Sequence, residues 1–151
     1  STYWIFFELL WRDYFRFITI KYGKNLFRRN GVNFSKKNIK YNVYNFKLWT
    51  EGKTTNKFIN AGMNELNLTG FLSNRMRQIV SSYLINELSC DWKAGAAWFE
   101  SQLVDYDAYS NQGNWSYIAG AGTDPRGGRF FNVEKQKNTY DPNSIYQSFW
   151  G

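Results

Sequence analysis

The side chains in this sequence that could carry chemistry are carboxylates, carboxamides, guanidinium groups and indoles, because histidine is absent. That absence excludes Ser-His-Asp and Cys-His triads as well as His-based metal sites. Cys90 is the one cysteine, so an intramolecular disulfide and a Cys-rich zinc site are also excluded, and we expect no metal. Any reaction therefore depends on a cofactor or on carboxylates.

Four clusters of such residues stand out, and each also has a purely structural explanation. Glu8 can form an ion pair with Arg12 one helical turn away, and Asp105 can be the partner of Arg77. The tryptophans can simply fill a core. For each cluster taken alone, the structural explanation is favoured. The clusters are Glu8 with Trp11, the residues Asn74, Arg75, Arg77 and Gln78, the pair Asp105 and Asp107, and Asn111 through Trp115.

Composition indicates a flat ligand and an anionic partner. Aromatic residues make up 21% of the chain, with 7 Trp, 11 Tyr and 13 Phe, which is more ring surface than packing usually requires. The net charge of +7 favours a partner such as nucleic acid. The apolar opening stretch, residues 3–11, contains Glu8 and is followed by Arg12, well short of the ~20 residues of a membrane span, so no membrane partner is expected.

The elements that must position these residues are predicted to be helices. Residues 3–20 lack glycine and proline and are apolar nearly all round, so we expect a core helix that is the most buried element. Apolar residues recur at spacings of three and four from about Ser73 to Leu88, and Asp91 is a suitable N-cap for a helix over 92–104. The polar stripe of the first of these two helices carries Asn74, Arg77, Gln78 and Ser81.

The remaining segments are less regular. Residues 21–47 favour a loop with short helical turns, and a short helix over 114–119 precedes a long glycine-rich loop. No stretch shows the alternation of a strand. The sequence as a whole, residues 1–151, therefore predicts one all-α domain.

The order of the sequence blocks resembles the photolyase and cryptochrome family over nearly the whole chain, most closely its DASH branch. The resemblance implies a multi-helix FAD-binding domain. It also implies that residues 1–151 are part of a longer enzyme, whose amino-terminal antenna domain is absent from this sequence. The matching blocks are residues 8–16, residues 63–78, Asp91-Trp92, residues 105–115, the loop 122–132, Gln136, and residues 140–142.

The family resemblance implies a deoxyribodipyrimidine photolyase. Such an enzyme uses FAD and blue light to repair cyclobutane pyrimidine dimers in DNA by electron transfer. Gln78 and Tyr117 stand where ordinary dimer photolyases carry Met and Trp, and loss of those contacts should weaken binding of a lesion in a duplex. The resemblance therefore implies single-stranded DNA as the substrate, because no base pairing has to be broken there. An antenna pigment such as a folate would bind the missing domain.

The same resemblance implies roles for individual residues. Asn111 would face N5 of the flavin, where a carboxamide can donate or accept a hydrogen bond. Trp11 would be the wall on which a flipped dimer stacks, and Glu8 with Asn74 would bind the dimer or the adenine side of the pocket. The implied catalytic residues are Glu8, Asn74, Trp11 and Asn111. The implied FAD ligands are Arg77, Asp105, Asp107, Asn111 and Asn74, with Arg77 and Asp105 forming a salt bridge.

Two further groups of residues follow from the resemblance. Trp115, Trp92 and Trp49 correspond to a chain of indoles that leads electrons from the surface to the flavin. Cationic contacts to phosphates would make DNA affinity sensitive to salt. The implied DNA-binding residues are Arg75, Arg129, Gln78, Tyr117 and Lys135.

Two other functions remain open from the sequence. The chain could belong to a cryptochrome-like blue-light photoreceptor without repair activity, or it could be a nucleic-acid-binding remnant without cofactor. Departures from the family pattern at residues 55–57, Asn60 and Asn64 affect the edge of the expected pocket. We expect the protein in the cytoplasm of a bacterium, or in an organelle or the nucleus of a eukaryote.

Overall fold

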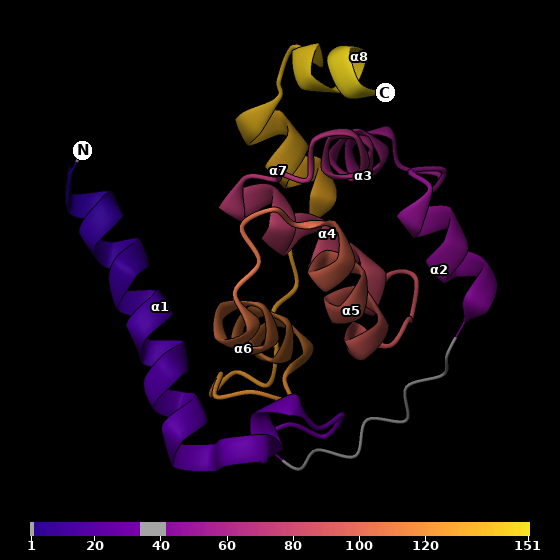
Figure 1. The fold of residues 1–151 in the computed structure, drawn as a ribbon. Coiled ribbons are helices and arrows are strands. Elements are labelled where there is room, and N and C mark those ends of the chain that lie inside the picture. Colours follow the sequence, from indigo (N-terminus) through magenta and orange to yellow (C-terminus); the bar gives the residue numbers. More distant parts are fainter. Residues whose placement is uncertain (1, 34–41) are drawn as a thin grey trace.

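The computed structural model describes residues 2–33 and 42–151, and every element within these ranges is a helix (Figure 1). This confirms the predicted all-α fold. The expected loop over 21–47 lies partly outside the described residues, but within it a 3-10 turn and the start of a helix are present. In chain order the elements are α1 Thr2–Tyr22, η1 Gly23–Phe27, α2 Val43–Thr50, α3 Lys57–Thr69, α4 Asn74–Asn86, α5 Trp92–Gln102, α6 Ala108–Ala119, α7 Val133–Tyr140 and α8 Ile145–Trp150.

Side-chain caps fix the starts of the helices that form the site. Ser73 accepts a hydrogen bond from the backbone N–H of Met76 at the start of α4, at 3.3 Å. Asp91 accepts one from Lys93 at the start of α5, at 3.0 Å, as the sequence predicted. Each cap satisfies a backbone donor that the first helical turn leaves without a partner.

Two helices differ from the sequence-based expectation. The helix expected at 114–119 begins six residues earlier as α6, because Asp107 caps it by accepting from Ser110 N–H at 2.8 Å. Helix α3 was not predicted. Its local signal is Asn56, whose side chain accepts from the N–H groups of Phe58 and Ile59.

The core lies where α3, α4, α5 and α6 meet, and α2 adds one large ring to it. Trp49 on α2 is fully buried, and its indole N–H donates to the carbonyl of Val80 at 3.1 Å. The Phe99 ring on α5 lies edge-on to Trp115 on α6, with ring centroids 5.1 Å apart. Gly95 permits this packing, since a Cβ there would lie 2.2 Å from the Trp115 ring.

Helix α1 is not the most buried element, contrary to the prediction. Phe15 is its one buried residue within the described part of the chain, whereas Trp4, Phe17 and Ile20 are 61–79% exposed. Figure 1 shows α1 at the edge of the molecule, on the side of α6 and far from α3. A helix that is apolar all round buries only the face that meets a neighbour, and here the neighbours are α6 and η1. None of the described helices is long and apolar enough to cross a membrane.

Several contacts attach α1 and the segment after η1 to α6 and its following loop. The Phe15 ring lies on Gly113 of α6, where a Cβ would come within 2.2 Å of it. Tyr14 Oη donates to Thr123 Oγ1 at 2.6 Å. After η1, the N–H groups of Val32 and Asn33 donate to the carbonyl of Ala121 at 2.9 and 3.1 Å. These contacts hold α1 in a fixed orientation across from α4.

The contact between Phe15 and Gly113 gives a testable prediction. Gly113→Ala should lower the free energy of unfolding by about 1–3 kcal/mol through overpacking, and Phe15→Ala by about 3–5 kcal/mol through loss of a buried ring. The double variant should lose less free energy of unfolding than the two single variants together, because removal of the Phe15 ring leaves room for the methyl group added at Gly113. Urea denaturation measures all three. Strictly additive losses would show that the two residues do not pack on each other.

Candidate functional site

Two adjoining cavities lie between α1 and the helices α4 and α6. The first, here called the inner cavity, has a volume of about 420 Å³ and is also lined by α5 and the segment after it. The second, the outer cavity, has a volume of about 610 Å³ and reaches the loop before α7. Both volumes fall in the range of small-molecule sites, roughly 300–1,000 Å³. The residues that line both include Glu8, Trp11, Phe15, Asn74, Gln78 and Asn114.

Arg77 and Asp105 form the predicted salt bridge on the wall of the inner cavity. One guanidinium nitrogen of Arg77 donates to both carboxylate oxygens of Asp105, each at 2.9 Å. Arg77 Nε donates to the carbonyl of Leu72 at 2.6 Å. The guanidinium group is therefore held by three acceptors, and it fixes a carboxylate from a segment 28 residues away.

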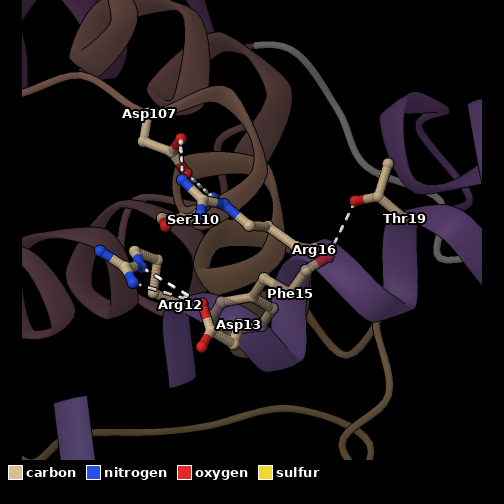
Figure 2. A network of polar contacts seen from close by, with 7 residues as sticks. All are labelled: Arg12, Asp13, Phe15, Arg16, Thr19, Asp107 and Ser110. Carbon is tan, nitrogen blue, oxygen red and sulfur yellow. Dashed lines mark hydrogen bonds and ion pairs between the residues drawn. The ribbon is translucent and has the colours of Figure 1, made fainter. Parts of the chain in front are cut away.

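Asp107 is a second carboxylate at this cavity, and it is held by α6 and α1 together. Figure 2 shows Asp107 facing Arg16 of α1 and Ser110 of α6. Asp107 caps α6 through Ser110, and its Oδ2 lies 4.0 Å from a guanidinium nitrogen of Arg16. Burial by itself would raise the pKa of Asp107. The hydrogen bonds from Ser110 and the nearby Arg16 and Arg12 outweigh burial and lower the pKa below its usual value. The carboxylate thus presents a negative charge at neutral pH.

Asn111 points a carboxamide at the inner cavity from the first half of α6. It is 8% exposed, and its Nδ2 donates to the carbonyl of Ala96 on α5 at 2.9 Å. Tyr106 lines the same cavity, and burial, followed by the nearby Glu100 carboxylate, raises the pKa of its phenol. An anchored amide beside a neutral phenol offers both donors and acceptors to the edge of a polar ring.

The wall between the cavities joins residues of α1 and α4. Asn74 Nδ2 donates to Glu8 Oε2 at 3.1 Å, across 66 residues of sequence. The alternative pairing of Glu8 with Arg12 is not the one that the structure has, because Arg12 contacts Asp13 at 3.4 Å. Trp11 stands beside this pair, and its ring is edge-on to Tyr117 of α6 with centroids 5.8 Å apart.

The predicted DNA-binding residues fall into two places. Arg75, Tyr117 and Arg129 line the outer cavity, and Gln78 lines both cavities. Lys135 lies exposed on α7 and lines neither cavity. The structure therefore brings four of these five residues together at one opening.

The three predicted relay tryptophans are all core residues. Trp115 lines the inner cavity, and its ring centroid is 6.2 Å from that of Trp49. Trp92 has other neighbours, since its indole N–H donates to the carbonyl of Arg29 at 3.0 Å and Lys93 Nζ lies 5.1 Å from its ring centroid. Trp49, Trp92 and Trp115 are each at most 2% exposed, so a path to the surface through them needs a further group. The relay stays a prediction.

Sequence reasoning missed three residues that shape the site, namely Phe15, Arg16 and Tyr106. A signal for Phe15 was available, because Glu8, Trp11 and Phe15 are spaced at three and seven on one helix face. Arg16 had no such signal, because its partner Asp107 is 91 residues later in the chain.

The residues of the inner cavity fit a flat cofactor with polar edges. Its walls combine the rings of Trp11, Phe99 and Trp115 with the anchored amide of Asn111 and the charge pair of Arg77 with Asp105. Ligand sites of this kind are mostly apolar and carry a few convergent polar groups that fix orientation.

Comparisons with known proteins agree with this geometry. The family model described as "FAD binding domain of DNA photolyase" matches residues 4–150. Cryptochrome DASH of Synechocystis sp. is 51% identical over 99% of this chain and 31% of its own length. The chloroplastic/mitochondrial cryptochrome DASH of Oryza sativa is 49% identical over 99% of this chain and 26% of its own length.

Solved structures show the same arrangement of helices. The Synechocystis sp. cryptochrome superposes with a TM-score of 0.91, at 51% identity over 99% of this chain and 31% of that one. An archaeal photolyase from Sulfolobus tokodaii, solved with two FAD molecules, superposes with a TM-score of 0.87, at 36% identity over 95% of this chain and 33% of that one. The chain thus spans between about a quarter and a third of the length of these relatives. These matches confirm the predicted family and cofactor: the chain belongs to the photolyase and cryptochrome family, within its helical FAD-binding domain.

Proposed function

We propose that the longer protein containing this domain repairs cyclobutane pyrimidine dimers in single-stranded DNA, using FAD and blue light. The observation that carries the proposal is the pair of adjoining cavities, which share the wall of Glu8, Trp11 and Asn74. Electron transfer needs donor and acceptor rings close together, and a shared wall allows a cofactor on one side and a lesion on the other.

The inner cavity would hold the isoalloxazine end of FAD. When bound, FAD supplies the light-driven electron that the side chains of this domain cannot supply. Asn111 would hydrogen-bond the ring edge, and the Arg77–Asp105 pair would orient the ring while remaining nearly neutral as a unit. The apolar walls would exclude water, which strengthens these polar contacts.

The outer cavity would hold a flipped dimer against Trp11. A dimer is weakly stacked, so it costs little to extrude, and an indole face binds a base with about 1–3 kcal/mol. The carboxylate of Glu8, fixed by the amide of Asn74, would accept a hydrogen bond from the lesion at the shared wall. Arg75 at the rim, and Lys135 further out on α7, would add phosphate contacts.

Binding of FAD tests the role of the inner cavity. Arg77→Ala should weaken FAD binding about tenfold or more, because it removes a charged donor and leaves Asp105 without its partner. Arg126→Ala is the matched control, since Arg126 is exposed and lines neither cavity. The measurement is titration of FAD followed by flavin fluorescence, after circular dichroism has shown equal helix content. Equal affinity of both variants would contradict the placement of FAD.

Binding of a dimer-containing single strand tests the role of Trp11. Trp11→Ala should weaken binding about 10- to 100-fold through loss of ring stacking, whereas Trp11→Phe should retain most of it. Tyr44→Ala is the control, because Tyr44 is an exposed ring on α2 outside both cavities. Fluorescence anisotropy with a labelled oligonucleotide gives the affinities. If all three variants bind like the wild type, the lesion does not stack on Trp11.

Trp115→Phe separates repair from light sensing. Photoreduction of bound flavin should slow markedly, because phenylalanine is much harder to oxidise than an indole. Dimer reversal after chemical reduction of the flavin should persist. The measurements are flavin absorbance under blue light and dimer loss by chromatography. A wild-type protein that photoreduces its flavin but never reverses a dimer would favour the photoreceptor function instead.

A further inference from the structure

Asp124 is a carboxylate buried in the loop between α6 and α7. Its side chain has no exposed surface. Its Oδ1 accepts a hydrogen bond from the backbone N–H of Arg126 at 3.2 Å, and its Oδ2 lies 3.0 Å from Nε of Arg129. The two atoms form an ion pair but no well-directed hydrogen bond. A buried carboxylate is costly unless it is paired, so this ion pair favours the observed position of the Arg129 guanidinium group.

Arg129 is also fixed along its backbone and at the far end of its side chain. Its N–H donates to the carbonyl of Ile118 at 2.9 Å, and its carbonyl accepts from Asn86 Nδ2 at 3.1 Å. One terminal guanidinium nitrogen donates to Tyr117 Oη at 2.5 Å. Arg129 therefore differs from an exposed phosphate-binding arginine, whose guanidinium group has to be free to reach the DNA backbone.

The hydrogen bond from Arg129 to Tyr117 restricts where the Tyr117 hydroxyl group can donate its own hydrogen. A phenol has one O–H donor and accepts through its oxygen lone pairs. Because the guanidinium group can only donate, it occupies a lone pair of Tyr117 and leaves the O–H to donate elsewhere. Tyr117 lines the outer cavity, with its ring edge-on to Trp11 at 5.8 Å.

We propose that Asp124 and Arg129 act as positioning residues that hold Tyr117, so that its O–H donates to a carbonyl oxygen of a pyrimidine base in the outer cavity. This inference rests on the proposed function, because it requires a base stacked on Trp11. A base in that position presents ring carbonyl oxygens at its edge, whereas its phosphates lie outside the cavity. Tyr117 thereby contributes to the specificity for the base, and Arg129 acts on binding through Tyr117.

The dependence of affinity on salt distinguishes positioning from phosphate contact. Arg129→Gln and Tyr117→Phe should each weaken binding of a dimer-containing single strand about fivefold. The double variant should be no weaker than the weaker single variant, because both changes remove the same hydrogen bond. The slope of log affinity against log salt should stay as in the wild type for Arg129→Gln. The matched control, Arg75→Gln, should reduce that slope by about one.

Opposite results would overturn the proposal. A slope reduced by about one in Arg129→Gln, with losses that add to those of Tyr117→Phe, would make Arg129 a phosphate contact. An affinity of Tyr117→Phe equal to that of the wild type would remove the proposed hydrogen bond.

A second measurement needs no DNA and separates this proposal from the proposed function. In NMR spectra the terminal guanidinium N–H groups of Arg129, one of which donates to Tyr117, should exchange slowly with solvent, and Tyr117→Phe should speed the exchange without unfolding the domain. Fast exchange in the wild type would overturn the positioning role even if DNA binds. If the wild-type protein binds no oligonucleotide, the proposed function fails, and the donor role of Tyr117 fails with it. The exchange rate still decides whether the Arg129 side chain is held in place.

Discussion

The packing of Phe15 on Gly113 is the contact on which both cavities depend. Helix α1 buries one residue, and it meets the rest of the domain at α6 and η1. Because glycine lets the phenyl ring approach the α6 backbone, α1 lies close enough to α4 for Glu8 to bond Asn74. The opposite side of each cavity is formed by helices that belong to the core. One wall thus belongs to the core, whereas the α1 side is held by one buried ring together with a few ring contacts, hydrogen bonds and an ion pair.

Three carboxylates at the site are each paired with an arginine. Pairing leaves polar groups available to a ligand and avoids the free-energy cost of burying an isolated charge. Asp105 is neutralised by Arg77, and Asp107 is stabilised by the α6 amino terminus and Arg16. Asp124 and Arg129 repeat this arrangement at the outer cavity, with the acid fully buried. In the first two cases the partner comes from another segment, whereas Asp124 and Arg129 belong to the same loop. The chain has a net charge of +7, which is compatible with the anionic partner of the proposed function.

Burial of the aromatic residues separates two uses of rings in this protein. Trp49, Trp92 and Trp115 are packed inside the domain, where they support the helices behind the inner cavity. Trp11 and Tyr117 line the outer cavity, where a ring can meet a ligand, and of the three core tryptophans only Trp115 also lines one of the two cavities, the inner one. The high aromatic content that suggested a flat ligand therefore reflects both a large core and a ring-lined site. Among the exposed rings of α1, Trp4 and Phe7 also line the outer cavity, whereas Phe17 lines neither cavity.

The amino-acid sequence alone predicted the helical class, the cap at Asp91, and the stripe that places Asn74, Arg77 and Gln78 on one face of α4, because these depend on spacings within a few residues. It also determined the family, since the matching blocks occur in a fixed order. The start of α6 at Ala108 was missed although its signal, the Asp107 cap, is local. The folded domain was needed to show that α1 is exposed and that Arg129 of the following loop donates to Tyr117 of α6. The physical reason is that apolar periodicity shows which residues can be buried, whereas actual burial and pairing depend on which distant segment arrives beside them.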